Sequence, residues 1–163
     1  MTLHLTADHL HLLRSHAEAT YPHECCGALL GMCASDGINE VRAVRRLHNA
    51  WNAEVARALA EPYTLSTTRR YWIDPADLLT VMREARTLGF DMIGIYHSHP
   101  DAPAVPSECD RRLAWSTYSY PILSVQQGHT QEVRSWQLDT AQQFQPEAIV
   151  IHPSSVPAPI HPR

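Results

Sequence analysis

The stretch DMIGIYHSHPDAPAVPSECD, residues 91–110, joins an apolar run to two histidines, a proline-containing turn and a Ser-x-x-Asp pattern. The apolar run predicts a β-strand, and Pro100 stops it because proline cannot donate to a ladder of backbone hydrogen bonds. Side chains two residues apart on a strand share a face. His97 and His99 therefore project together from the end of this strand, while Ser98 points away.

A short helix is expected at residues 107–116, after the loop 101–106. The prolines of this loop can turn the chain back over the end of the strand. If Ser107 starts the helix, Asp110 lies one turn inside it and on the same face. The carboxylate of Asp110 would then approach the two imidazoles.

Two neutral imidazoles and one carboxylate suit zinc, and three protein ligands leave a fourth position for water, as in catalytic sites. Bound Zn²⁺ lowers the pKa of that water to about 7. Each half of the pattern also has an ordinary interpretation. A His-x-His pair at a strand end is often only a polar pair on the surface, and Ser-x-x-Asp is a common helix start. Their combination at this spacing favours a metal site with one Zn²⁺ per chain.

A zinc hydrolase also needs a base that takes the proton of the water. Glu24, within YPHECCGALLG (residues 21–31), stands at a helix-to-strand junction beside an apolar run, which is an unusual place for a charge. Burial would raise its pKa, whereas a nearby metal ion would lower it. The alternative interpretation is an exposed glutamate in a turn.

Hydrophobic periodicity and turn residues predict the remaining elements. Helices are expected from Thr6 to just before Pro22 and from Asp74 to Gly89; strands are expected at residues 3–5, 25–33, 40–47, 70–73, 120–127, 132–139 and 147–151. Residues 49–70 read as an excursion from the core, partly helical and partly loop. This order of elements predicts an α/β or α+β sandwich built on one mixed β-sheet, and we adopt the α/β class with a mixed β-sheet flanked by helices.

The chain has 163 residues, which suits a single domain. Its net charge of −4 and scattered arginine pairs argue against nucleic-acid binding. No apolar run approaches the roughly 20 residues that span a bilayer, and the first residues lack the pattern of a signal peptide. We therefore expect a cytoplasmic protein without membrane or nucleic-acid partners. We also expect reduced cysteines at all four positions, with Cys25 and Cys33 as small packing residues.

The combined motif resembles the JAMM (MPN-plus) metalloproteases, whose pattern is an upstream glutamate, then H-x-H-P, six residues and S-x-x-D. Here HSHP (97–100) is followed by six residues and SECD (107–110), with Glu24 upstream. The surroundings of Glu24 (Pro22-x-Glu24-x-Cys26-Gly27) and IDPADLL (73–79) also resemble the family. The resemblance runs from about residue 3 to residue 151, and a chain this short is similar to the prokaryotic single-domain branch.

The resemblance implies a sandwich-like fold similar to MPN domains and cytidine deaminases, with a domain at residues 1–151 and a proline-rich tail at 152–163. It implies that His97, His99 and Asp110 are zinc ligands and that Glu24 is the general base and acid. It further implies that Ser107 hydrogen-bonds the developing oxyanion or holds the water.

The resemblance also implies hydrolysis of the amide bond after the C-terminal Gly-Gly of a ubiquitin-like or sulfur-carrier protein. Residues 63–72 (YTLSTTRRYW) have the composition of an edge strand that could receive such an extended tail by backbone pairing. The identity of the substrate and the kind of amide bond stay open, as does a homodimer.

Two other classes compete with this interpretation. A non-proteolytic zinc-binding interaction module of the MPN fold would keep the metal for structure, but Glu24 argues against it. A DNA-repair-associated relative shares an H-x-H-P motif. The acidic net charge and the lack of a helix-hairpin-helix pattern argue against that class.

Overall fold

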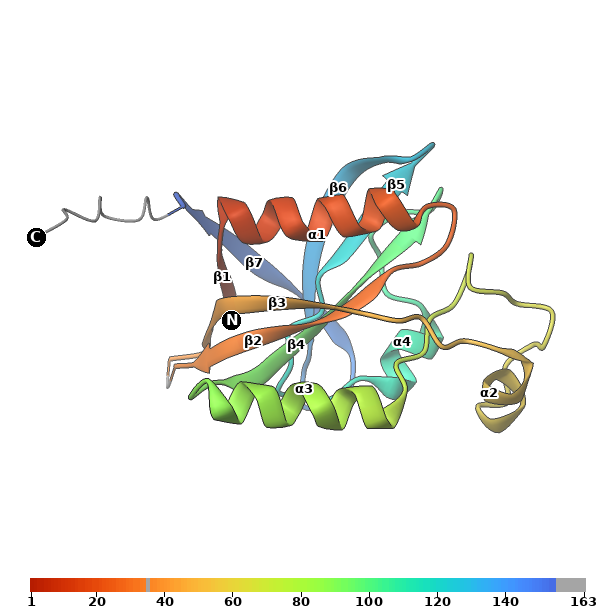
Figure 1. Cartoon of the computed structure of the whole chain (residues 1–163), viewed down its shortest axis with the longest axis horizontal. Helices are drawn as coiled ribbons and strands as arrows, with labels where there is room; N and C mark the ends of the chain where they lie inside the picture. The colour runs from red at the N-terminus through yellow and green to blue at the C-terminus, as the bar shows by residue number, and fades with distance from the viewer. Residues whose placement is uncertain (35, 155–163) are drawn as a thin grey trace, which may run out of the picture.

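The protein is described by a computed structural model that covers residues 1–34 and 36–154. Within these residues, seven strands form a sheet in the order β1-β3-β2-β4-β5-β6-β7, which closes into a barrel (Figure 1). Closure occurs because β1 (Thr2–Thr6) pairs in parallel with both β3 (Ile38–Leu47) and β7 (Phe144–His152). The first and last strands of the described chain therefore lie side by side.

The other strand pairs make the sheet mixed. β2 (Cys26–Cys33) is antiparallel to β3 and to β4 (Asp91–Pro100). β5 (Ile122–Gln126) runs parallel to β4, and β6 (His129–Leu138) is antiparallel to β5 and β7. The predicted mixed sheet is thus confirmed, whereas its closure into a barrel was not predicted.

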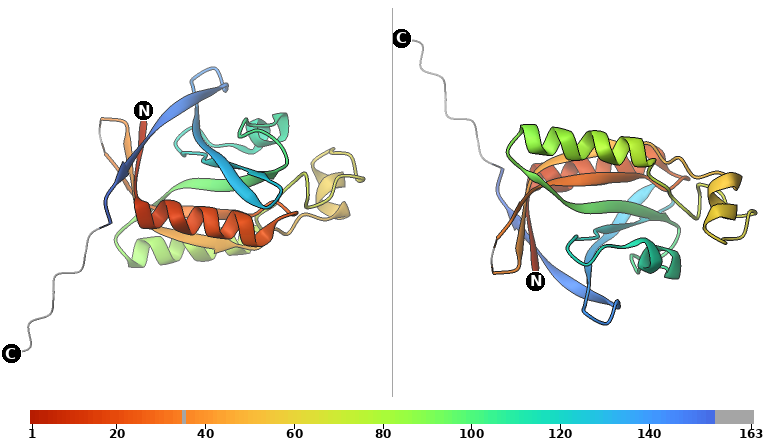
Figure 2. Two further views of the ribbon diagram at one scale, coloured as in Figure 1. Left: turned by 90° about the horizontal axis from the view of Figure 1, so that it is seen from above. Right: turned by 90° about the horizontal axis from the view of Figure 1, so that it is seen from below.

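Two long helices flank the sheet on opposite sides (Figures 1 and 2). The helix α1 (Ala7–Thr20) starts where predicted, with the Thr6 side chain accepting a hydrogen bond from the backbone N–H of His9. The helix α3 (Pro75–Thr87) is capped by the Asp74 side chain, as predicted. Two shorter helices, α2 (Ala53–Ala58) and α4 (Glu108–Leu113), lie at the end of the barrel where β4 ends.

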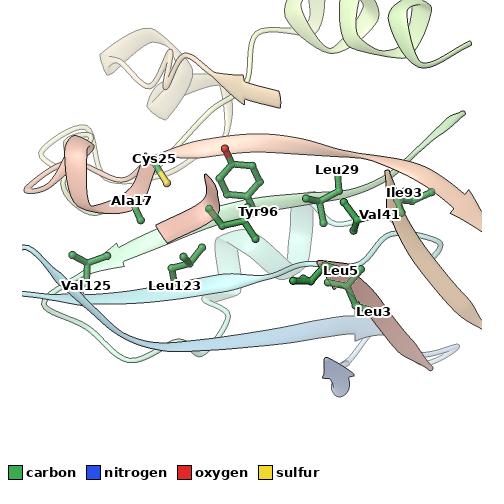
Figure 3. Close-up of a cluster of buried hydrophobic side chains, with 11 residues drawn as sticks. Leu3, Leu5, Ala17, Cys25, Leu29, Val41, Ile93, Tyr96, Leu123 and Val125 are labelled. Carbon is green, nitrogen blue, oxygen red and sulfur yellow. The ribbon is translucent and has the colours of Figure 1, made fainter. Parts of the chain in front are cut away.

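The strand β2 is covered on both faces, which explains its nearly continuous apolar sequence. On one face, Leu29 joins the main core with Leu13 of α1 and Tyr96 of β4, and Figure 3 shows part of this cluster. On the other face, Leu30 packs in a second cluster with Val81 of α3. Complete burial of such a side chain contributes about 1.5–3 kcal/mol. The two clusters therefore stabilise β2 and β4 next to the start of β2 and the end of β4, where the site lies.

Two predicted strands are wrong. Residues 70–73 form no strand, because the Trp72 N–H donates to Asn49 Oδ1 (3.2 Å) and the Trp72 carbonyl accepts from Ala50 N–H (2.8 Å). The expected edge strand at 63–72 is a series of turns, in which Arg69 N–H donates to the Ser66 carbonyl at 3.0 Å. Within the described residues, no strand lies between β3 and β4.

Smaller differences concern element ends and cysteines. The helix predicted at 107–116 is shorter. The last strand is longer than the predicted 147–151, because it begins at Phe144 and includes His152, which the sequence assigned to the tail. Residues 155–163 of that tail lie outside the described residues. All four cysteines are free, as predicted, but Cys33 is exposed, whereas Cys25 is buried. No helix in the described part of the chain is long and apolar enough to cross a membrane.

Candidate metal centre

Three side chains converge where β4 ends and α4 begins. Ring nitrogens Nε2 of His97 and His99 lie 3.0 Å apart. Nε2 of His97 is 3.5 Å from Oδ1 of Asp110, and Nε2 of His99 is 3.8 Å from Oδ2 of Asp110. The structure therefore brings together the three predicted ligands, with one ligand atom of each within 4.8 Å of the others.

These separations fit a shared metal ion. In a tetrahedral zinc site with bonds of about 2.0–2.1 Å, two ligand atoms are about 3.3 Å apart. The three observed separations fall on either side of this value. The His97–His99 contact has an ordinary hydrogen-bond length, whereas the two contacts with Asp110 are longer, so the cluster leaves space between its three ligand atoms that a metal ion could occupy. Two imidazoles and a carboxylate are a suitable donor set for Zn²⁺.

Contacts behind the ligands orient both imidazoles. His99 Nδ1 lies 2.8 Å from the carbonyl oxygen of Pro103. Because a carbonyl can only accept, Nδ1 carries the proton, and in the neutral ring Nε2 has the lone pair that a metal ion needs. Burial alone would lower the pKa of His99, but Asp110 and Glu24 raise it, so a metal ion would have to displace a proton there. The His97 side chain is 1% exposed, and the ring of Tyr71 stacks on it at a centroid distance of 4.5 Å. Burial lowers the pKa of His97, which favours the neutral form that a metal ligand requires.

The Ser-x-x-Asp pattern forms a reciprocal cap on α4. Asp110 N–H donates to Ser107 Oγ at 3.1 Å, and Ser107 N–H donates to Asp110 Oδ2 at 2.6 Å. Burial alone would raise the pKa of Asp110, but His97, His99 and Ser107 favour its charged form and hold that pKa well below its usual range. The common helix start expected from the sequence is therefore real, and the same geometry fixes the orientation of the carboxylate.

Glu24 is buried, with 5% of its surface exposed. It precedes β2, and desolvation raises the pKa of its carboxyl group from 4.5 to about 8. The interpretation of Glu24 as an exposed turn residue is therefore wrong. A carboxyl group with a pKa near neutrality can accept and return a proton at physiological pH.

A hollow of about 120 Å³ opens beside these groups. Its walls include Glu24, His99, Ser107 and Asp110, whereas His97 lies buried behind them. Tyr71 also lines the hollow. No local motif selects it as a site residue, because its place in the site depends on a ring stack between distant segments. A buried carboxyl group, a hydroxyl group and a metal-binding cluster around one small hollow are the groups that metal-assisted hydrolysis requires.

The fold and the site together define a class of protein. It has a closed mixed β-barrel, a His-His-Asp cluster that could hold a metal ion at the end of one strand, and a buried glutamate beside that cluster. The family of prokaryotic homologs of the JAB domain matches residues 6–139. The chain belongs to this family, so the resemblance to the prokaryotic JAMM branch is confirmed.

Individual relatives agree with this assignment. A desampylase of Haloferax volcanii is 33% identical over 127 residues, which cover 75% of this chain and 80% of that protein. A probable TtuB-protein conjugate cleaving protease of Thermus thermophilus is 33% identical over 95 residues, which cover 58% of this chain and 61% of that protein. The solution structure of a protein from Desulfitobacterium hafniense has a TM-score of 0.75 and 27% identity, with 94% of each chain covered.

Proposed function

We propose that this protein is a zinc-dependent hydrolase that cleaves the amide bond after the C-terminal Gly-Gly of a ubiquitin-like or sulfur-carrier protein. One observation carries the proposal: His99 and Asp110, which cluster with the buried His97, line a hollow that the buried Glu24 also lines. A site that held a metal ion only for structure would be closed by a fourth protein ligand. In the described residues, the cluster has three.

Zinc held by His97, His99 and Asp110 would supply Lewis acidity and lower the pKa of a bound water. Glu24 then acts as the base that accepts the proton of the attacking water, and it later returns this proton to the leaving amine. Its burial supports this role because desolvation makes the carboxylate a stronger proton acceptor than an exposed glutamate, an effect that a nearby zinc ion would oppose.

Ser107 is suited to stabilise the oxyanion that develops on the scissile carbonyl. Its Oγ accepts the hydrogen bond from Asp110 N–H, so the orientation of the hydroxyl group is already set. The hydroxyl hydrogen is then free to donate into the hollow that Ser107 lines. A donor held in place before reaction stabilises the transition state without reorganisation.

The proposed substrate rests on the chemistry of glycine and on the relatives. Because glycine has no side chain, an extended Gly-Gly tail can bring its backbone closer to the groups that line the hollow than other residues can. The names of the relatives, a desampylase and a probable TtuB-protein conjugate cleaving protease, support hydrolysis of ubiquitin-like protein conjugates.

The test is incubation of the zinc-loaded protein with Gly-Gly-terminated fusions, followed by mass spectrometry of the products. We expect cleavage directly after the second glycine and no cleavage when that glycine is valine. Glu24→Gln should keep its zinc and lose about 10²- to 10⁴-fold in turnover. Glu54→Gln changes an exposed glutamate of α2 and is the matched control. Wild-type turnover in Glu24→Gln would show that the base is elsewhere, and a zinc-loaded protein that cuts no fusion would favour the non-proteolytic module.

A further inference from the structure

The side chain of Asn49 connects the segment before β2 to the segment before α3. Its Nδ2 donates to the carbonyl oxygens of Glu24 and Arg70, both at 3.0 Å. Its Oδ1 accepts from the backbone N–H groups of Trp51 at 3.1 Å and Trp72 at 3.2 Å. An asparagine amide has two N–H donors and one oxygen with two lone pairs. Asn49 therefore uses its full hydrogen-bonding capacity to join these two segments.

One side of this junction holds the backbone at Glu24. The Glu24 N–H donates to the Thr67 carbonyl at 2.7 Å, and the Glu24 carbonyl accepts from Asn49. The next residue is held as well, because Cys25 N–H donates to Ser98 Oγ on β4 at 2.8 Å. The direction in which the Glu24 carboxyl group enters the hollow depends on this backbone. Asn49 is the only side chain among the described residues that donates to the Glu24 carbonyl.

The other side of the junction holds Tyr71. Asn49 binds the carbonyl of the residue before Tyr71 and the N–H of the residue after it, so its amide brackets the Tyr71 backbone. The Tyr71 ring stacks on His97, with an angle of 28° between the ring planes. One asparagine side chain is therefore connected on one side to the proposed base and on the other to the aromatic ring over a proposed zinc ligand.

We propose that Asn49 is a positioning residue of this site, which sets the Glu24 backbone and the Tyr71 ring relative to each other. The inference rests on the proposed function, because it assigns Asn49 a role in the same reaction. Asn49 acts through its neighbours: its hydrogen bonds in the described structure go to backbone groups. Aspartate has the same shape but no donor, so it would set a carboxylate oxygen against the carbonyls of Glu24 and Arg70.

The test compares Asn49→Asp with Asn52→Asp, the same chemical change three residues further along the chain. Asn52 is exposed and caps α2 through Oδ1, an acceptor that aspartate retains. The single donor contact of the Asn52 side chain within the described residues, from Nδ2 to the Ala50 carbonyl, is long at 3.4 Å, so its loss should have little effect. In the zinc-loaded protein, Asn49→Asp should lower kcat on a Gly-Gly fusion by about 10- to 100-fold, because small misplacements of reacting groups have effects of this size. KM should change less than about twofold, since positioning acts on the transition state.

Amide hydrogen exchange supplies a readout that does not depend on activity or on zinc. Asn49→Asp should accelerate exchange in peptides covering residues 22–26 and 69–73, and it should leave the β5 peptide 120–126 unchanged. Asn52→Asp should match the wild type in both measurements. Asn49→Ser removes the amide without adding a charge, and it should show the same local exchange and the same loss of kcat if the aspartate variant fails to fold.

The outcomes separate this inference from the proposed function. A folded Asn49 variant with wild-type kcat overturns the positioning role. So does a variant in which hydrogen exchange is faster throughout the chain and kcat and KM change equally. Glu24→Gln is measured in parallel. If Glu24→Gln abolishes turnover while the Asn49 variants retain it, only the inference about Asn49 is wrong. If Glu24→Gln keeps turnover, the role of Glu24 as the base is wrong. If the zinc-loaded wild type cuts no Gly-Gly fusion, the proposed function itself is wrong, and the exchange data alone then decide whether Asn49 joins the two segments.

Discussion

Replacing Glu24 by glutamine should remove a large part of the pH dependence of stability in the zinc-free protein. Desolvation raises the pKa of Glu24 from 4.5 to about 8, and 5% of the residue is exposed. An acid with a raised pKa binds its proton more tightly in the folded state than in the unfolded chain. Its contribution to stability is therefore fully present below pH 4.5 and is lost as the pH rises through the folded-state pKa of about 8.

The size of the effect follows from the linkage between proton binding and folding. Between the unfolded-state and folded-state pKa values, each pH unit lowers the free energy of unfolding by about 1.4 kcal/mol. Near the folded-state pKa the free energy of unfolding depends less steeply on pH. Between pH 6 and pH 8, Glu24 should lower the free energy of unfolding by about 2 kcal/mol. Glutamine has a similar shape and does not titrate, so Glu24→Gln should lack this decrease.

The assay is urea unfolding of chelator-treated protein at pH 6, 7 and 8. Glu54→Gln, which changes an exposed glutamate, should retain the wild-type pH dependence. The reasoning would be refuted if the free energy of unfolding of Glu24→Gln fell with pH as steeply as that of the wild type. Glu24 would then titrate alike in the folded and unfolded chains.

Three further variants test the metal, the oxyanion donor and the core. Asp110→Ala should lose its zinc, measured by elemental analysis, because two imidazoles alone hold the ion poorly; full zinc occupancy would exclude Asp110 as a ligand. Ser107→Ala should keep zinc and lose roughly 10²-fold in kcat on a Gly-Gly fusion; unchanged kcat would contradict its role. Leu29→Ala should lower the free energy of unfolding by about 2–5 kcal/mol in urea, whereas the exposed Leu79→Ala should change it by less than about 1 kcal/mol.

The features that the sequence determined by itself are those that depend on short-range geometry. The two-residue period of a strand is sufficient to place His97 and His99 on one face. The Ser107–Asp110 cap and the start of α3 at Asp74 depend on hydrogen bonds between near neighbours. Such features could be predicted because few other arrangements of these residues satisfy the backbone locally.

The tertiary structure decided everything that depends on partners far apart in the chain. The barrel closes because β1 pairs with β7, and no local sequence pattern predicts a pairing between strands so far apart in the chain. The burial and raised pKa of Glu24 depend on its place beside the hollow at the end of β4. Residues 70–73 have the composition of a strand, but a strand forms only where its backbone groups find a neighbouring strand. Here the backbone groups of residues 70 and 72 instead form hydrogen bonds with the side chain of Asn49 and the backbone of Ala50. This segment therefore forms part of the wall of the site and not a strand.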